Sequence, residues 1–209
     1  MQDDCLRIAD IDIRDTWVAV KPAMHYHMGG ILTDVDGRSS VHGLYAAGEV
    51  ACTGSNGVDR LGGNSLLEAR VFGRRAGWAV AREARAATVA PVRAPDLRTV
   101  TAPSRGAAYG CGALMTRFCG ILRRADDLEV LKEHLAADPP SSRRLVAQLI
   151  VDAAHRRRES RGVQCRTDFP NSDDRRRVRH VVRQAAGDEP QWRVDPVRAP
   201  TSLPPGREY

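Results

Sequence analysis

Apolar residues recur at helical spacing over residues 64–87, NSLLEARVFGRRAGWAVAREARAA. Separations of three and four predict one amphipathic helix, with the apolar positions Leu66, Leu67, Val71, Phe72, Ala76 and Val80. Asn64 or Ser65 fits its N-cap, and Glu68 lies where the acid of a capping box would sit for Ser65. We therefore expect the helix to begin at this pair of residues.

The region before this helix has short apolar runs separated by glycine. WVAVKPAMHY, residues 17–26, reads as an extended apolar segment, and residues 30–50 read as strand, turn and strand. The pair Asp36-Gly37 suits a tight turn with positive φ, and VHGLYAAG, residues 41–48, is expected to be a short buried strand. A strand, a glycine loop and a capped helix together outline a ligand site.

The second half of the chain has helical periods. Residues 113–136 predict one or two helices, and DPPS at residues 138–141 ends that pattern. LVAQLIVDAAHRRRE, residues 145–159, predicts an amphipathic helix with one apolar face formed by Leu145, Leu149, Ile150, Ala153 and Ala154. RTDFP, residues 166–170, is expected to close the packed region.

These patterns divide the chain into four zones. Residues 1–86 carry the glycine motifs, and residues 87–105 form a linker of proline, threonine and alanine without a period. Residues 106–174 form the helical part. In residues 175–209 the composition changes to arginine, proline, aspartate and glycine, so we expect a poorly ordered basic tail.

The chain of 209 residues has a net charge of +6 and a pI near 9.4. Arginine supplies almost all of the positive charge, because Lys21 and Lys132 are the only lysines. No aromatic residues interleave with the arginine clusters to form a stacking platform, so we favour a solvated, ion-paired surface over a nucleic-acid surface.

Location and redox state follow from two absences in the sequence. No run approaches the roughly 20 apolar residues of a membrane span, and the acidic N-terminus is unlike a secretory signal. The cysteines form no CxxC pair, which favours reduced thiols over a disulfide framework or zinc site; they are Cys5, Cys52, Cys111, Cys119 and Cys165. We expect a cytoplasmic protein without a metal site.

Candidate chemistry gathers around the glycine motifs at residues 25–30 and 59–73. The start of the predicted helix presents unpaired N–H groups and a partial positive charge, which favour an anionic or electron-rich ligand. Gly62 and Gly63, like Gly29 and Gly30, permit a close approach of the backbone to a flat ligand.

Two side chains add specific chemistry to these motifs. The Glu49 carboxylate can accept hydrogen bonds from hydroxyl groups, and the guanidinium fork of Arg60 suits a carboxylate. The parts together indicate a flat, hydroxyl-bearing cofactor and a small acid.

Four motifs in order resemble one enzyme family. HYHMGGI, GLYAAGEVACTG, RLGGNSLLEARVFG and ESRGVQCRTDFP are similar to motifs of the flavoprotein family of succinate dehydrogenase, fumarate reductase and L-aspartate oxidase. The resemblance covers roughly residues 5–174. It implies an α/β FAD-binding segment, the C-terminal part of a Rossmann-like flavoprotein domain, followed by a small helical C-terminal domain.

The resemblance also implies roles for individual residues. The family's FAD is bound by the glutamate that matches Glu49 and by backbone N–H groups that match Ser65 and Leu66, and we include Asn64, Gly29 and Gly30 in the cofactor site. The family holds a substrate carboxylate with residues that match His25 and Arg60, which we take as the catalytic pair.

Two activities fit the resemblance. MGGI and RLGGNSLLE favour succinate dehydrogenase or fumarate reductase, whereas GEVACTG, GILRRADDLEVLKEHL and RTDFP favour L-aspartate oxidase. We favour oxidation of L-aspartate to iminoaspartate, which passes electrons to oxygen or fumarate and serves de novo NAD biosynthesis.

The sequence departs from the family in three positions and in extent. Asn56 and Gln164 replace histidines, and Asp59 replaces an asparagine. The family's GxGxxG motif and capping domain are absent, so we expect a C-terminal portion that binds FAD weakly or not at all alone, and a separate N-terminal half as its candidate partner. A non-catalytic remnant and an arginine-rich binding protein remain as alternatives.

Overall fold

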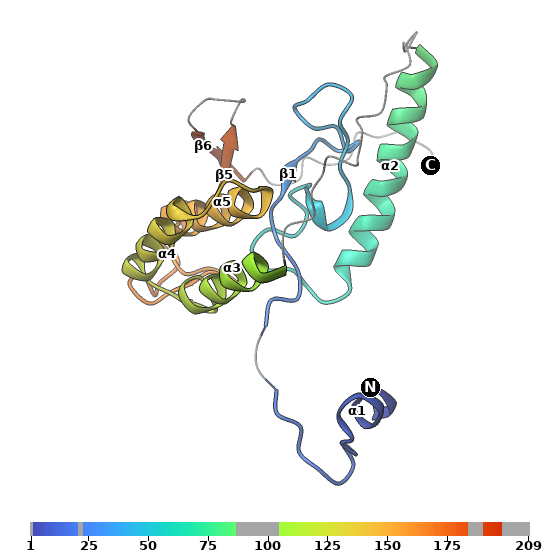
Figure 1. Cartoon of the computed structure of the whole chain (residues 1–209). Coiled ribbons are helices and arrows are strands. Elements are labelled where there is room, and N and C mark those ends of the chain that lie inside the picture. The colour runs from blue at the N-terminus through green and yellow to red at the C-terminus, as the bar shows by residue number, and fades with distance from the viewer. Residues whose placement is uncertain (1, 21–22, 87–104, 184–189, 198–209) are drawn as a thin grey trace.

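The computed structural model describes residues 2–20, 23–86, 105–183 and 190–197 (Figure 1). The expected linker therefore lies almost wholly outside the described residues. Helices are α1 (Gln2–Ala9), α2 (Asn64–Ala86), α3 (Arg105–Phe118), α4 (Ala125–Ala137) and α5 (Ser142–Arg156). Strands are β1 (Ile31–Leu32), β2 (Ala51–Cys52), β3 (Leu122–Arg123), β4 (Cys165–Arg166), β5 (Val178–Arg183) and β6 (Gln191–Pro196), with 3₁₀ turns η1 (Gly48–Val50) and η3 (Asp174–Arg176).

Figure 1 shows α2 on one side of the molecule, with β1 and the loops around it, and α3, α4 and α5 packed together on the other. In the described part of the chain the strands form three separate pairs: β1–β2 and β3–β4 are parallel, and β5–β6 is antiparallel. No helix among the described residues is long and apolar enough to cross a membrane.

The parallel pair β1–β2 joins two of the family motifs, HYHMGGI and GLYAAGEVACTG. Ile31 pairs with Ala51, and Leu32 with Cys52. Gly30 precedes β1 with φ +115°, and a Cβ at this position would lie 2.2 Å from the carbonyl oxygen of Val50. The close approach that Gly30 permits is therefore to the chain's own backbone, and glycine is required there.

The predicted strand over residues 41–48 is wrong. The turn at Asp36-Gly37 is confirmed, since Gly37 has φ +78° and its N–H donates to the Asp34 carbonyl at 3.1 Å. After it, an isolated bridge between Arg38 and Tyr45 is the only pairing described for residues 41–48. Hydrogen bonds from the Ala46 N–H to the Gly37 carbonyl and from the Ser39 N–H to the Leu44 carbonyl close a short hairpin, and the chain then enters the 3₁₀ turn η1.

Helix α2 confirms the predicted helix, but only part of its predicted apolar face is buried. Ala76 and Ala79 are buried, while Leu66 and Leu67 are 79% and 64% exposed. The alanines are buried because their small side chains let α2 approach the preceding loop closely: a Cβ on Gly37 would lie 2.8 Å from that of Ala76. The leucines of the first turn have no such cover.

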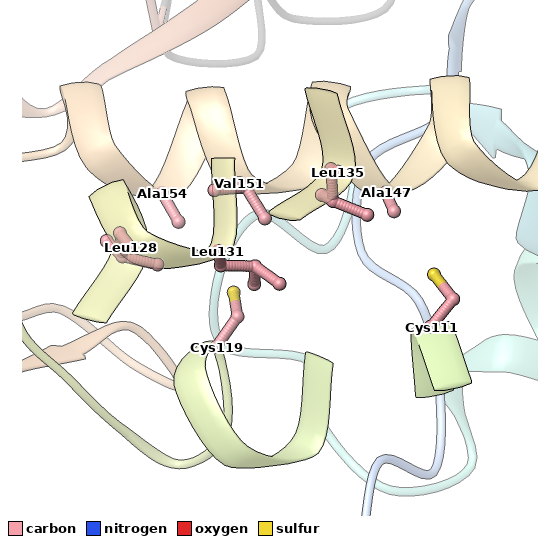
Figure 2. Close-up of a cluster of buried hydrophobic side chains, with 8 residues drawn as sticks. All are labelled: Cys111, Cys119, Leu128, Leu131, Leu135, Ala147, Val151 and Ala154. Carbon is pink, nitrogen blue, oxygen red and sulfur yellow. The ribbon is translucent and has the colours of Figure 1, made fainter. Parts of the chain in front are cut away.

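The helical part has its own hydrophobic core, formed by α3, α4 and α5 (Figure 2). Residues 113–136 form two helices, because the chain turns at Gly120 and runs through β3 between them. The core consists of Cys111, Cys119, Leu128, Leu131, Leu135, Ala147, Val151 and Ala154.

Helix α5 confirms the predicted helix, but it begins and ends three residues earlier than the predicted range 145–159, and only part of the predicted face is buried. Ser141 caps it, accepting a hydrogen bond from the Arg144 N–H at 3.1 Å. The buried face is Ala147, Val151 and Ala154, whereas Leu145 is exposed. The reason is the three fully buried leucines of α4, which fill the space between the helices and leave room for small side chains on α5.

The expectation of a poorly ordered tail is wrong for the strands β5 and β6. They pair over their whole length, from Val178 opposite Pro196 to Arg183 opposite Gln191. Two arginines at the end of α5 hold this hairpin: Arg157 donates to the Val178 carbonyl at 2.8 Å, and Arg156 stacks 4.7 Å from the ring centroid of Trp192.

A buried arginine joins the ends of two helices. Arg166 is 1% exposed, and its Nη1 donates to the carbonyls of Ala154, His155 and Arg157 at the end of α5, at 3.0–3.2 Å. Its Nε and Nη2 bind the Asp168 carboxylate at 2.8 and 2.7 Å. Asp168 in turn accepts from the N–H of Ala125, the first residue of α4.

The pair of Arg166 and Asp168 predicts that the free energy of unfolding falls in acid. Hydrogen bonds from Arg166 lower the pKa of Asp168 to about 2, so the stabilisation is complete above the ordinary carboxyl pKa near 3.8 and is lost as the pH falls through 2. We expect Asp168→Asn to remove about 2 kcal/mol at neutral pH and to flatten the dependence of unfolding free energy on pH between 5 and 2. Urea unfolding across this range measures it.

The matched control is Asp126→Asn, because Asp126 also pairs with an arginine two residues away, Arg124, but is 81% exposed. We expect no measurable change from it. Equal pH profiles for Asp168→Asn and the unaltered chain would contradict the assignment.

Candidate functional site

Glu49 is held against the first glycine motif. It lies in η1, just before β2, and its Oε1 accepts a hydrogen bond from the backbone N–H of His27 at 2.8 Å. The side chain of Glu49 is nevertheless exposed. This arrangement fixes the carboxylate and leaves it accessible to a ligand.

Arg60 lies beside the same motif. Its guanidinium carbon is 4.5 Å from the centroid of the Tyr26 ring, and its Nη1 donates to the carbonyl of Leu61 at 3.2 Å. Tyr26 directly follows the exposed His25. The structure thus brings the predicted arginine to the HY pair, although 34 residues separate Arg60 from Tyr26 in the sequence.

Tyr26 is a site residue that the sequence analysis missed. Its ring provides the cation–π platform that holds Arg60. Partial burial raises the pKa of its phenol, and the negative charges of Glu68 and Glu49 raise it further, against the opposing effect of Arg60. No sequence pattern predicts the stacking of Arg60 on Tyr26, because stacking partners need not be close in the chain.

Glu68 does not form the predicted capping box. It is buried, and its carboxylate accepts hydrogen bonds from Thr53 at 2.5 Å, from Ser55 at 3.0 Å and from the side-chain amide of Asn56. Hydrogen bonds from three donors of the preceding loop stabilise this carboxylate more than one hydrogen bond from a backbone N–H in the first turn of the helix would. Glu68 therefore anchors the loop that leads to Arg60, and Asn56 is one of its partners.

The start of α2 is open. A Cβ built on Gly62 or on Gly63 would meet no atom within 4 Å, and Gly63 has φ +86°. The Ser65 hydroxyl is buried beside the phenol of Tyr26. An accessible glycine backbone at the start of a helix and the exposed Glu49 carboxylate fit a flat ligand that carries hydroxyl groups and a polar edge.

Gln164 has a structural place. It is buried, its Oε1 accepts from Arg123, and its Nε2 donates to the Ala154 carbonyl at 3.2 Å. The residue in the position of the family's histidine thus links β3 to the end of α5.

Some arginines of the basic stretches are ion-paired. Arg157 and Arg161 bind the fully buried Glu159 at 2.8 and 3.1 Å, and Arg175 binds Asp173 at 3.0 Å. Carboxylates thus neutralise part of the positive charge, which supports the interpretation of an ion-paired surface.

Comparisons with known proteins agree with this geometry. Residues 1–66 match the FAD binding domain, and residues 142–209 match the C-terminal domain of the fumarate reductase flavoprotein. The apo complex of Mycobacterium smegmatis Sdh1 superposes with a TM-score of 0.77 at 27% identity over 96% of this chain and 41% of that one. Escherichia coli quinol fumarate reductase FrdA, in its E245Q form, superposes with a TM-score of 0.73 at 25% identity, over 99% of this chain and 42% of that one.

This chain belongs to the flavoprotein family of fumarate reductase, succinate dehydrogenase and L-aspartate oxidase. Within it, the chain is 49% identical to the L-aspartate oxidase of Caulobacter vibrioides, over 79% of this chain and 32% of that protein. Identity to the L-aspartate oxidase of Rhodospirillum rubrum is 42%, over 80% and 64%. A fumarate reductase flavoprotein subunit of Mycobacterium tuberculosis is 36% identical, over 79% of this chain and 36% of that one.

The chain spans about a third of the length of the Caulobacter relative.

Proposed function

We propose that this chain is the C-terminal portion of an FAD-dependent L-aspartate oxidase and that it contributes one side of the flavin and substrate site. The position of Arg60 carries the proposal: its guanidinium lies over Tyr26, the residue that follows His25, and the N–H of His27 in the same motif binds Glu49. The identities of 49% and 42% to L-aspartate oxidases support L-aspartate as the substrate.

The residues around the start of α2 would hold FAD. Glu49 would accept hydrogen bonds from its hydroxyls, and the backbone N–H groups of Ser65 and Leu66 would face its polar edge, with Asn64 beside them. The positive end of the α2 dipole favours negative charge on that edge. FAD, when bound, supplies the capacity to accept two electrons.

Arg60 and His25 would hold a substrate carboxylate. A guanidinium binds a carboxylate with two parallel hydrogen bonds, which orients the acid as well as binding it. The stacking of Arg60 on Tyr26 reduces the rotamer freedom that binding would otherwise have to remove.

The rest of the FAD-binding domain would cover the exposed apolar residues at the site. Leu61, Leu66 and Leu67 are 64–79% exposed around the start of α2. Such a cluster is typical of a surface that another part of the protein buries. We propose that this part is the N-terminal portion of the flavoprotein, on the same polypeptide or a separate one.

The test is an activity assay of this chain combined with the N-terminal portion of the Caulobacter vibrioides L-aspartate oxidase. The proposal predicts L-aspartate-dependent reduction of oxygen or fumarate, in which two electrons and two protons leave each L-aspartate to give iminoaspartate, and no oxidation of succinate. Oxidation of succinate instead would favour the fumarate reductase alternative. The 36% identity to the Mycobacterium tuberculosis subunit supports that alternative. Flavin binding without either activity would indicate a non-catalytic remnant.

A further inference from the structure

We propose that the turn at residues 159–164 positions Arg60. The turn belongs to the helical part, whereas Arg60 belongs to the loop before α2. The link between them is a hydrogen bond from the N–H of Val163 to the carbonyl of Val58 at 3.0 Å. The expected effect on catalysis rests on the proposed function of Arg60, whereas the positioning of Arg60 by the turn does not.

Gly162 makes the contact possible. It has φ +55°, and a Cβ at this position would lie 2.3 Å from the Val58 oxygen and 3.1 Å from the Cβ of Asp59. Any side chain would therefore push the loop away. The backbone of the turn and the backbone of the loop meet two residues before Arg60.

The turn is rigid enough to act as a support. Arg161 and Gln164 exchange backbone hydrogen bonds at 2.8 and 3.0 Å, which closes the turn. Glu159, fully buried, fixes it to the end of α5 through its ion pairs with Arg157 and Arg161, and also accepts from the N–H of Asp173 at 3.0 Å.

The loop itself is held at two places. Glu68 binds its first residues, Thr53 to Asn56, and Val163 binds Val58. Arg60 follows the second anchor with only Asp59 between them. A shift of Val58 is therefore passed to Arg60 and alters its stacking on Tyr26.

Gly162→Ala tests the contact, with Gly43→Ala as the matched control. Gly43 also has positive φ, +78°, but a Cβ there would meet nothing within 4 Å. Both variants strain the backbone, and only Gly162→Ala displaces Val58. The readout is the NMR signal of the Arg60 Nε–H group, which the Tyr26 ring current shifts.

We expect Gly162→Ala to move this signal towards the position of an unstacked arginine and Gly43→Ala to leave it unchanged, while the methyl signals of Leu128, Leu131 and Leu135 stay in place in both. An unchanged Arg60 signal in Gly162→Ala would overturn the inference. If that variant does not fold, the unaltered chain decides: the Val163 amide must be protected from hydrogen exchange and show scalar coupling to the Val58 carbonyl carbon, and absence of both overturns the inference.

Kinetics separate this inference from the proposed function. In the enzyme completed with the N-terminal portion, we expect Gly162→Ala to raise KM for L-aspartate about tenfold, with kcat and FAD affinity changed less than about twofold. A displaced Arg60 signal with unchanged KM would support the positioning role and contradict the assignment of Arg60 to the substrate.

Discussion

Replacing Arg166 with methionine is expected to lower the free energy of unfolding by about 3–5 kcal/mol. The change leaves the Asp168 carboxylate without its partner and removes the donor to three carbonyls at the end of α5. Each orphaned buried acceptor costs about 1–3 kcal/mol, and methionine replaces only the volume of the side chain. Arg166→Lys is expected to restore only part of the loss, because an ammonium group lacks the planar fork.

Urea unfolding followed by circular dichroism measures the effect. The matched control is Arg124→Met: Arg124 also pairs with an aspartate two residues later, Asp126 at 2.9 Å, but both side chains are more than half exposed. A surface pair of this kind contributes about 0–1 kcal/mol. If both variants lost the same stability, Arg166 would not be the joint between α4 and α5.

Replacing Arg60 with alanine is expected to lower kcat/KM for L-aspartate by about 100-fold in the enzyme completed with the N-terminal portion. The variant loses the paired hydrogen bonds to a substrate carboxylate, a contribution of about 3 kcal/mol. Arg60→Lys keeps the charge but not the fork, so we expect it to fall between the two. FAD affinity should stay within about twofold, because Glu49 and the start of α2 are unaltered.

Steady-state kinetics with varied L-aspartate measure this prediction. Arg70→Ala is the control, because Arg70 is an exposed arginine on α2, ten residues after Arg60. We expect it to keep the unaltered kcat/KM. A kcat/KM for Arg60→Ala within about threefold of the unaltered enzyme would remove Arg60 from the substrate site.

Local patterns predicted the elements whose interactions are local. The period of residues 64–87 gave the extent of α2, and Asp36-Gly37 gave a turn, because helix periodicity and positive φ are properties of neighbouring residues. The family motifs gave Arg60 and Glu49, and the structure places both beside the first glycine motif. Their binding roles stay predictions.

The features that were missed depend on contacts between distant residues. Arginine side chains are usually exposed, but Arg166 is buried. Its burial is possible because the carbonyl groups at the end of α5 and the Asp168 carboxylate accept hydrogen bonds from its guanidinium. Glu68 accepts hydrogen bonds from the preceding loop and does not form the capping box that the local pattern predicts. The hairpin β5–β6 has a charged composition typical of a tail, but Arg156 and Arg157 of α5 hold it in place.

The most direct test of the central claim is the absorbance spectrum of flavin retained after gel filtration with FAD, for this chain alone and for this chain combined with the N-terminal portion of the Caulobacter relative. The claim is that the chain supplies one side of a flavin site. It predicts no retained flavin for the chain alone and about one flavin per complex for the combination. A chain that alone retains stoichiometric flavin, or a complex that forms and retains none, would contradict it.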